Sequence, residues 1–211
     1  MGGITMRCGF VVDTQRCTGC HTCSVACRME NNLPEGVWWT RVVTVGGERM
    51  DTPAGTFPDA AMGYYTLSCQ HCANPACAAA CPTGAAYRDE AAGTVRQDAR
   101  ACTGCGACLD ACPYPGVRTL VEEEPRYSLP FAVGDACAPV HRGGTVEKCT
   151  MCAHRLERGL EPACVGACPA RARFFGDFDD PASPVSRLAA ERPSRLLSPE
   201  KGTEPSVLYL V

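Results

Sequence analysis

The spacing of the cysteines constrains this chain more than any other feature of its sequence. Only Cys8 and Cys137 of its 18 cysteines lie outside four groups of four, and every group ends in a C-x-x-x-C pair. The groups are Cys17, Cys20, Cys23 and Cys27; Cys69, Cys72, Cys77 and Cys81; Cys102, Cys105, Cys108 and Cys112; and Cys149, Cys152, Cys164 and Cys168. Such regular repetition indicates four related ligand sets.

The third group shows the expected chemistry most clearly. Residues 102–113 read C-x-x-C-x-x-C-x-x-x-C-P, a spacing that holds [4Fe–4S] clusters in bacterial ferredoxins. Three thiolates come from one tight loop, whereas the fourth cysteine begins a short helix and reaches a neighbouring cluster. Pro113 then stops that helix. The spacing therefore predicts [4Fe–4S] clusters that occur in pairs.

Other uses of dense cysteine fit this spacing less well. A secreted disulfide scaffold is disfavoured, because thiols at three-residue intervals in one loop would compete for each other. Structural zinc favours two separated C-x-x-C pairs and does not need the additional C-x-x-x-C pair. Cys17, Cys20 and His21 also spell the haem c attachment motif C-x-x-C-H, but both thiols already belong to a group of four. Iron–sulfur clusters are the favoured interpretation.

Composition argues against several classes of protein. The 211 residues suit one large domain or two small ones, and a net charge of -3 without a basic block does not favour nucleic acid. No stretch approaches the roughly 20 apolar residues of a membrane-spanning helix, and the first ten residues do not resemble a signal peptide. We find no nucleophile–base pair, phosphate loop or paired carboxylates in a recognisable setting. Catalysis is therefore expected in a partner.

Short strands and helices are predicted around the cysteine groups. We expect strands over residues 7–14, 64–67, 94–97 and 170–176, and helices over 21–31, from 74 onward and over 180–191. Val42, Val43 and Val45 before Gly46-Gly47 predict a hairpin within residues 38–50. Residues 51–63 and 113–148 are predicted to be mostly loop, and 195–211 an extended tail. A unit of strand, cysteine loop, short helix and strand thus recurs, which predicts an α+β fold.

Several polar residues adjoin the cysteines. Cations beside a cluster favour its reduced form. The candidates for this role are Arg16, Arg28, Arg100 and Lys148, although each could equally be a solvated surface charge. The neighbouring histidines, His21, His71 and His154, are not expected to be ligands because each group already supplies four thiolates. Cys137 and His141 are too few for a fifth metal site.

The order and spacing of the four groups resemble a known family. The second group has four residues between its middle cysteines, and the fourth group has eleven. Further matching stretches are residues 74–77, 148–155, 161–164, 176–177 with 180–181, and 202–206. Over nearly its whole length, the chain resembles the iron–sulfur electron-transfer subunits of the DMSO reductase family of molybdopterin enzymes.

The resemblance implies a ligation scheme, which the crossed fourth cysteine also favours. Cluster A would be held by Cys17, Cys20, Cys23 and Cys168, and cluster B by Cys27, Cys149, Cys152 and Cys164. Cluster C would be held by Cys69, Cys72, Cys77 and Cys112, and cluster D by Cys81, Cys102, Cys105 and Cys108. Because all of these positions are cysteine, four [4Fe–4S] clusters are implied.

The family also implies an architecture of two ferredoxin-like halves with long loops. Residues 1–63 and 141–181 would form one half, residues 64–140 an inserted half, and residues 182–211 a helix and a partner-docking tail. The implied partner is a catalytic subunit that carries molybdopterin of the bis-guanine-dinucleotide type, and some relatives add a membrane quinol-reacting subunit. The clusters would relay single electrons between that catalytic subunit and a quinol-linked subunit or soluble carrier. Assembly is expected in the cytoplasm, and the final site is cytoplasmic, or periplasmic with a twin-arginine-signalled partner.

Two other functions remain open at this point. A free polyferredoxin would shuttle electrons without a permanent partner, but the near-neutral charge and the long tail favour an arm that wraps around a partner. A zinc-stabilised interaction module would be colourless and free of iron.

Overall fold

The computed structural model describes residues 6–211 and is a mixed α+β fold. The predicted unit of strand, cysteine loop, helix and strand is confirmed and occurs four times. The units are β1 (Cys8–Asp13), α1 (Thr22–Glu30) and β2 (Thr40–Val45); β3 (Gly63–Ser68), α2 (Ala76–Ala79) and β4 (Ala86–Asp89); β5 (Thr94–Gln97), α3 (Ala107–Asp110) and β6 (Arg118–Val121); and β7 (Thr145–Lys148), α4 (Ala153–Leu156), α5 (Ala163–Gly166) and β8 (Arg173–Asp177). They are followed by α6 (Pro184–Glu191), β9 (Ser194–Arg195), a 3-10 turn (Pro199–Lys201) and β10 (Val207–Leu210).

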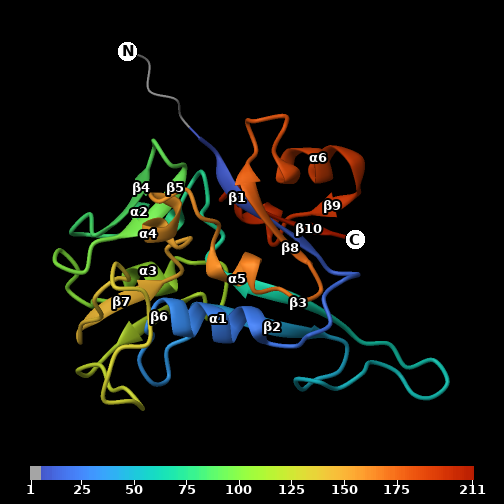
Figure 1. The fold of residues 1–211 in the computed structure, drawn as a ribbon, viewed down its shortest axis with the longest axis horizontal. Coiled ribbons are helices and arrows are strands. Elements are labelled where there is room, and N and C mark those ends of the chain that lie inside the picture. The colour runs from blue at the N-terminus through green and yellow to red at the C-terminus, as the bar shows by residue number, and fades with distance from the viewer. Residues whose placement is uncertain (1–5) are drawn as a thin grey trace.

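A four-stranded sheet has the strand order β8-β1-β10-β9, and α6 packs against it (Figure 1). β1 is buried at every position and pairs antiparallel to β8 and parallel to β10. Because side chains alternate along a strand, Val11 and Leu210 pack with Val185 of α6 on one face. Phe10 and Tyr209 pack on the other face with Cys23 and Met151, toward the cysteine loops.

Two hairpins cross the predicted boundaries between the expected halves. β3 pairs with β2 along its whole length, and β7 pairs with β6. The predicted boundaries at residues 63/64 and 140/141 therefore separate strands that pair with each other. Boundaries after β3 and after β7 agree better with the pairing, although the division into two halves itself stays a prediction.

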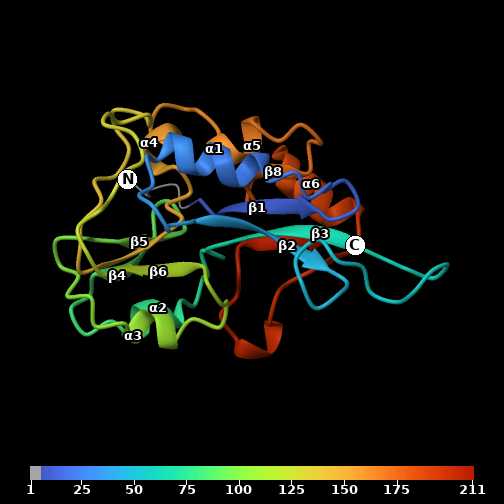
Figure 2. The same ribbon diagram turned by 90° about the horizontal axis from the view of Figure 1, so that it is seen from below.

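The predicted tight turn at Gly46-Gly47 is wrong. β2 finds its partner only at β3, and residues 46–62 form a long connection that projects from the body (Figures 1 and 2). The residues directly after Gly47 are charged and the following stretch contains two prolines, whereas Tyr64, Tyr65 and Leu67 supply the apolar strand that can pair with β2. The segment 113–148 is mostly loop, as predicted, but it also contains the paired strands β6 and β7.

The C-terminal segment contributes to the core, and its role in docking a partner stays a prediction. β10 lies between β1 and β9, and Tyr209 and Leu210 have no exposed surface. The hydroxyl of Tyr209 donates to the Thr66 carbonyl oxygen at 3.1 Å and accepts from Gln70 at 3.2 Å. This end of the chain is therefore held by its own sheet and by the second cysteine loop.

Candidate metal centres

Each cysteine loop turns through a left-handed residue directly before its second cysteine. The four residues are Gly19, His71, Gly104 and Met151, with φ between 45° and 71°. Glycine adopts this conformation freely, and at Gly104 a Cβ atom would lie only 2.4 Å from the Gly144 carbonyl oxygen. His71 and Met151 are fully buried, so packing holds them in a conformation that their side chains disfavour.

Two small enclosed cavities are lined by the cysteines expected at clusters A and C. The first is lined by Cys17, Cys20, Cys23 and Cys168, and the second by Cys69, Cys72, Cys77 and Cys112. None of the 18 cysteines forms a disulfide, and so the thiols are available as ligands. Four thiols around one cavity are the donor set that a [4Fe–4S] cluster requires. The residues therefore fit such a cluster at both places.

The cysteines expected at cluster B are deeply enclosed. Cys27, Cys149, Cys152 and Cys164 are all buried. Burial, together with the charges of the neighbouring thiols, raises the pKa of Cys152 to about 11 and the pKa of Cys27 well above its ordinary value. Metal-free thiols here hold their protons, and cluster binding must release them.

The cysteines expected at cluster D lie closer to the surface. Cys105 is exposed, Cys81 and Cys102 are half-buried, and Cys108 is buried. Backbone N–H groups donate to sulfur here: Ala86 to Cys81 at 3.4 Å and Val146 to Cys102 at 3.4 Å. Burial raises the pKa of Cys108, and Cys102 adds to that increase. Cys102 thus packs against the hydrophobic cluster that contains Cys108, while Cys105 is exposed.

Neighbouring sets approach each other in a fixed order. Cys23 and Cys164 pack in one hydrophobic cluster, which joins the set expected at cluster A to that at B. Cys149 and Cys69 pack together in a second hydrophobic cluster, and Cys77 and Cys108 in a third. The sets therefore follow one another in the order A, B, C, D. Each end set includes an exposed cysteine, whereas the two middle sets have none.

Three buried cations lie among these sets. Arg118 Nη2 donates to Cys77 Sγ at 2.8 Å. Burial opposes the charge of Arg173, but Cys164 and Cys23 outweigh it and raise its pKa. Lys148 Nζ donates to the carbonyl oxygens of Val95 and of Cys149, the latter at 2.9 Å. Lys148 was among the predicted cations, whereas Arg118 and Arg173 were missed, although each begins the strand that follows a C-P pair.

The other predicted cations lie farther out. Arg16 and Arg100 are exposed, and their backbone N–H groups donate to Asp13 and Asp98. Arg28 is half-buried, donates to the Val37 carbonyl oxygen and lies 5.0 Å from the ring of Trp38. A role for these three residues at a cluster stays a prediction.

Residues of the C-terminal segment lie beside the cysteines expected at cluster C. The sequence analysis did not predict this contact. Thr203 lines its cavity and shares a 2.8 Å hydrogen bond with the hydroxyl of Tyr114. Thr203 and Glu204 also accept, through their carbonyl oxygens, the backbone N–H groups of Asn74 and Ala73. The stretch 202–206, noted for the family resemblance, therefore covers the second cysteine loop.

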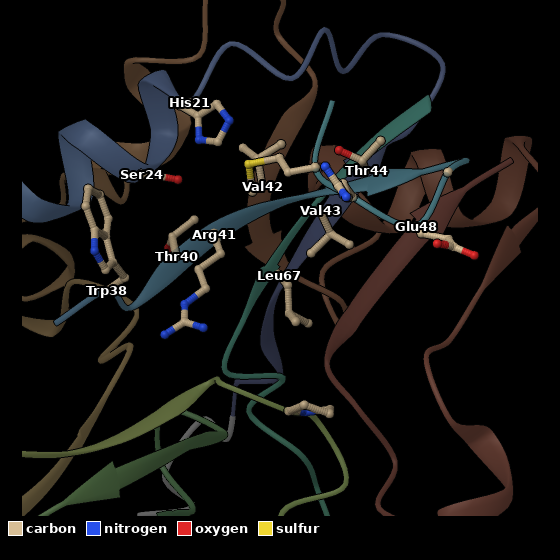
Figure 3. A pocket seen from close by; sticks show the side chains of 14 residues that line it. His21, Ser24, Trp38, Thr40, Arg41, Val42, Val43, Thr44, Glu48 and Leu67 are labelled. Atoms are coloured by element: carbon tan, nitrogen blue, oxygen red, sulfur yellow. The ribbon is translucent and has the colours of Figure 1, made fainter. Parts of the chain in front are cut away.

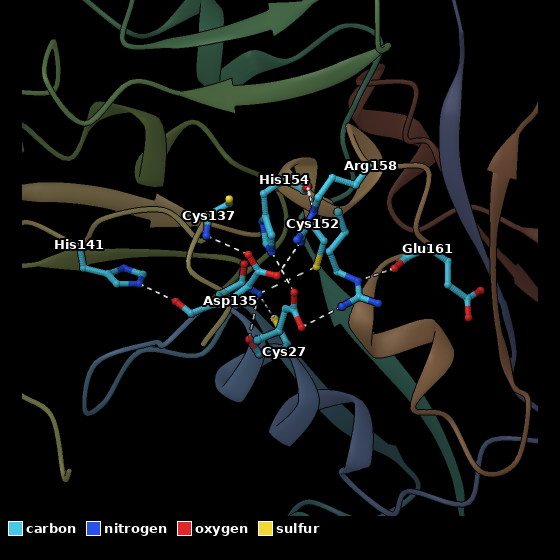
Figure 4. A network of polar contacts seen from close by, with 11 residues as sticks. Cys27, Asp135, Cys137, His141, Cys152, His154, Arg158 and Glu161 are labelled. Atoms are coloured by element: carbon cyan, nitrogen blue, oxygen red, sulfur yellow. Dashed lines mark hydrogen bonds and ion pairs between the residues drawn. The ribbon is translucent and has the colours of Figure 1, made fainter. Parts of the chain in front are cut away.

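The histidines near the cysteines have partners of other kinds. His71 Nδ1 accepts the Val95 N–H at 3.2 Å, and His154 pairs with Glu30 at 3.0 Å. Both nitrogens of His141 are engaged, by Glu147 and by the Asn31 carbonyl oxygen, which leaves none for a metal. Glu30 and Asp135 approach His154, but Arg155 and Arg158 already neutralise them (Figure 4).

A groove over β2 holds no recognisable reaction centre among the described residues. It has a volume of about 590 Å³ and is lined by residues that include His21, Ser24, Arg41 and Glu48 (Figure 3). Among residues 6–211, no Ser, Thr or Cys side chain is hydrogen-bonded to a histidine. None of the helices in this described part has the length and apolar character needed to cross a bilayer.

Known proteins resemble this chain over most of its length. The family described as "4Fe-4S dicluster domain" matches residues 60–127 and 127–178. The chain is 46% identical to the putative dimethyl sulfoxide reductase iron-sulfur subunit of Halobacterium salinarum, over 96% of this chain and 78% of that protein. The chain belongs to the iron–sulfur subunits of the DMSO reductase family.

Other members of the family are similar over a comparable extent. The arsenate respiratory reductase iron-sulfur subunit ArrB of Shewanella is 38% identical, over 97% of this chain and 96% of that protein. A tetrathionate reductase subunit of Salmonella typhimurium is 35% identical, over 97% of this chain and 72% of that protein. The chain is thus an electron-transfer iron–sulfur subunit with 4Fe-4S dicluster domains, as the resemblance in its sequence predicted.

Proposed function

We propose that this iron–sulfur subunit relays single electrons through four [4Fe–4S] clusters, A to D, to or from a molybdopterin catalytic subunit. The observation that carries the proposal is the order in which the cysteine sets pack against one another, with exposed cysteines at both ends and none in the middle. The middle clusters would be shielded from solvent, whereas the exposed cysteines of the two end sets would let a partner approach clusters A and D. Each cluster supplies one-electron chemistry when bound.

The residues divide this work among themselves. The sixteen thiolates hold the clusters, Arg118, Arg173 and Lys148 place positive charge beside them, and backbone N–H groups donate to sulfur. The positive charges and the N–H donors favour the reduced, more negative form of a cluster. The chain itself is proposed to be non-catalytic, because relatives are named as iron–sulfur subunits of reductases.

The partners are proposed from the relatives. Halobacterium salinarum and Shewanella members are named as subunits of a reductase, which supports a catalytic subunit of the molybdopterin bis-guanine-dinucleotide type as the partner here. A membrane quinol-reacting subunit or a soluble carrier would serve the other end. We also propose assembly in the cytoplasm, with final location there or, through a twin-arginine-signalled partner, in the periplasm.

An anaerobic pull-down of the chain from its native host tests this function. Mass spectrometry should find a large molybdopterin subunit at one to one, and metal analysis about 16 iron atoms per small chain, as four cubes require. An iron-rich chain that arrives alone would favour the free polyferredoxin instead. A colourless chain that contains zinc would overturn the proposal.

A further inference from the structure

Asn31 lies at the end of α1, directly beside two of the cysteines expected at cluster B. Only 1% of this residue is exposed. Its side-chain Nδ2 donates to the Cys27 carbonyl oxygen at 2.9 Å and lies 3.7 Å from Cys27 Sγ and 4.0 Å from Cys152 Sγ. One amide group thus reaches sulfur atoms from two different cysteine groups.

The surroundings determine which end of the amide faces the sulfurs. The three neighbouring atoms, one carbonyl oxygen and two sulfurs, are all acceptors in the loaded protein, so the NH₂ group must point toward them. Asn31 Oδ1 is then buried without a partner. Because an unpaired buried oxygen destabilises a fold, other contacts must hold this orientation.

A buried pair of side chains holds the backbone of Asn31. His141 Nε2 donates to the Asn31 carbonyl oxygen at 2.8 Å, and His141 Nδ1 lies 2.8 Å from a carboxylate oxygen of Glu147. The side chains of His141 and Glu147 are only 2% and 10% exposed, and the ring of Trp39 packs 5.7 Å from the imidazole. The long connection before β7 is thereby fixed to the end of α1.

We propose that Asn31, positioned by His141 and Glu147, raises the reduction potential of cluster B. The inference rests on the proposed function, because cluster B must be present. A donor to thiolate sulfur disperses negative charge and favours the reduced cluster, which carries one more electron. Burial acts in the opposite direction, since an apolar interior disfavours added charge. Asn31 therefore offsets the effect of burial at the cluster whose four ligands are all buried.

Redox titration of the anaerobic, cluster-loaded chain by electron paramagnetic resonance tests the proposal. In Asn31→Leu, one of four midpoints should fall by about 59 mV, equivalent to a tenfold lower ratio of reduced to oxidised cluster. Asn31→Asp should lower the same midpoint further, because a carboxylate adds negative charge. The Cys27→Ser variant identifies that midpoint as cluster B, since it alters one of the ligands.

Neighbouring residues provide the controls. Asn32→Gly should leave all four midpoints unchanged. The side chain of Asn32 accepts the Val133 N–H and donates to no cysteine sulfur among the described hydrogen bonds, and glycine readily adopts its φ of 47°. His141→Leu should lower the cluster B midpoint in the same direction as Asn31→Leu. His141→Gln retains an N–H donor and should restore most of the shift.

A measurement on the unaltered protein guards against variants that fail to assemble. The chain contains only three asparagines, so side-chain-amide ¹⁵N-labelled asparagine can be introduced selectively. Pulsed electron paramagnetic resonance of the reduced chain should detect ¹⁵N coupling at cluster B. Four loaded clusters with no such coupling, or unchanged midpoints in Asn31→Leu, would overturn this inference and leave the proposed function intact. A chain without iron would overturn both.

Discussion

Arg118 brings a permanent positive charge to the cysteines expected at cluster C. It is 5% exposed, and its guanidinium donates to Cys77 Sγ and, at 3.1 Å, to the side chain of Gln97. We expect Arg118→Met to lower the potential of cluster C by tens of millivolts, because the reduced cluster loses a charged hydrogen bond. Redox titration measures this, with Arg100→Met as the exposed control. Equal shifts in the two variants would contradict the prediction.

A substitution at Gly104 tests whether the third cysteine loop requires glycine at its tight turn. Gly104→Ala would place a Cβ atom 2.4 Å from the Gly144 carbonyl oxygen, at a φ of 67° that alanine disfavours. We expect a chain that binds fewer than the about 16 iron atoms of four cubes. Gly84 has a φ of 69° with no neighbour within 4 Å, so Gly84→Ala should cost only about 1–2 kcal/mol and keep its iron. Iron analysis that finds both variants equally loaded would exclude the predicted clash.

His141 should make stability depend on pH. Burial disfavours its charge, but the hydrogen bond and charge of Glu147 outweigh burial and raise its pKa above 6.5. A raised folded pKa stabilises the fold fully below the unfolded pKa, and this contribution is lost as pH rises through the folded pKa. We expect the melting temperature of the loaded chain to fall over that range. His141→Gln should flatten the dependence, whereas His21→Asn should preserve it.

At the scale of elements, β10 closes the main sheet and covers the second cysteine loop. Tyr209 is fully buried and is hydrogen-bonded to Thr66 and Gln70. We expect Tyr209→Ala to lower the free energy of unfolding by about 3–5 kcal/mol, as for other large aromatic truncations. Val211→Ala, at an exposed position, should change it by less than about 0.5 kcal/mol. Thermal melts of the loaded chains compare the two variants, and equal stabilities would show that β10 contributes little.

Helices and strands whose apolar pattern lies within their own residues could be predicted from the sequence. The strand at residues 8–13, the helix at 22–30 and the helix at 184–191 each have their own apolar pattern and lie where predicted. The pairing of β10 with β1 could not be predicted, because the register of Phe10 with Val207 joins residues from opposite ends of the chain. Arg118 and Arg173 were missed for the same reason, since their contacts with thiols arise only after folding.

At the scale of the whole molecule, the cysteine loops have few large apolar side chains of their own. Thiols form part of four of the five hydrophobic clusters, as in the group of Cys77, Val95, Cys108 and Val146. Their spacing predicted the ligand types, whereas the order of the sets along the molecule became visible only from contacts between groups. Clusters would therefore complete the core, and metal binding should be coupled to folding.

Iron removal should unfold much of the chain. We expect anaerobic chelation to abolish the native circular dichroism spectrum and the cooperative melt, and reconstitution with iron and sulfide to restore both. Incubation with the chelator's metal complex, which cannot extract iron, serves as the control. A native-like spectrum and a cooperative melt without iron would contradict the coupling.

The position of β10 also sets an order of events during protein synthesis. Among the described elements, β1 is synthesised first and its parallel neighbour β10 last. The sheet cannot close, and Thr203 cannot cover the second cysteine loop, until translation has passed Leu210. All four cysteine groups are thus synthesised before the strand that completes the sheet, and a chain that terminates before this strand lacks it.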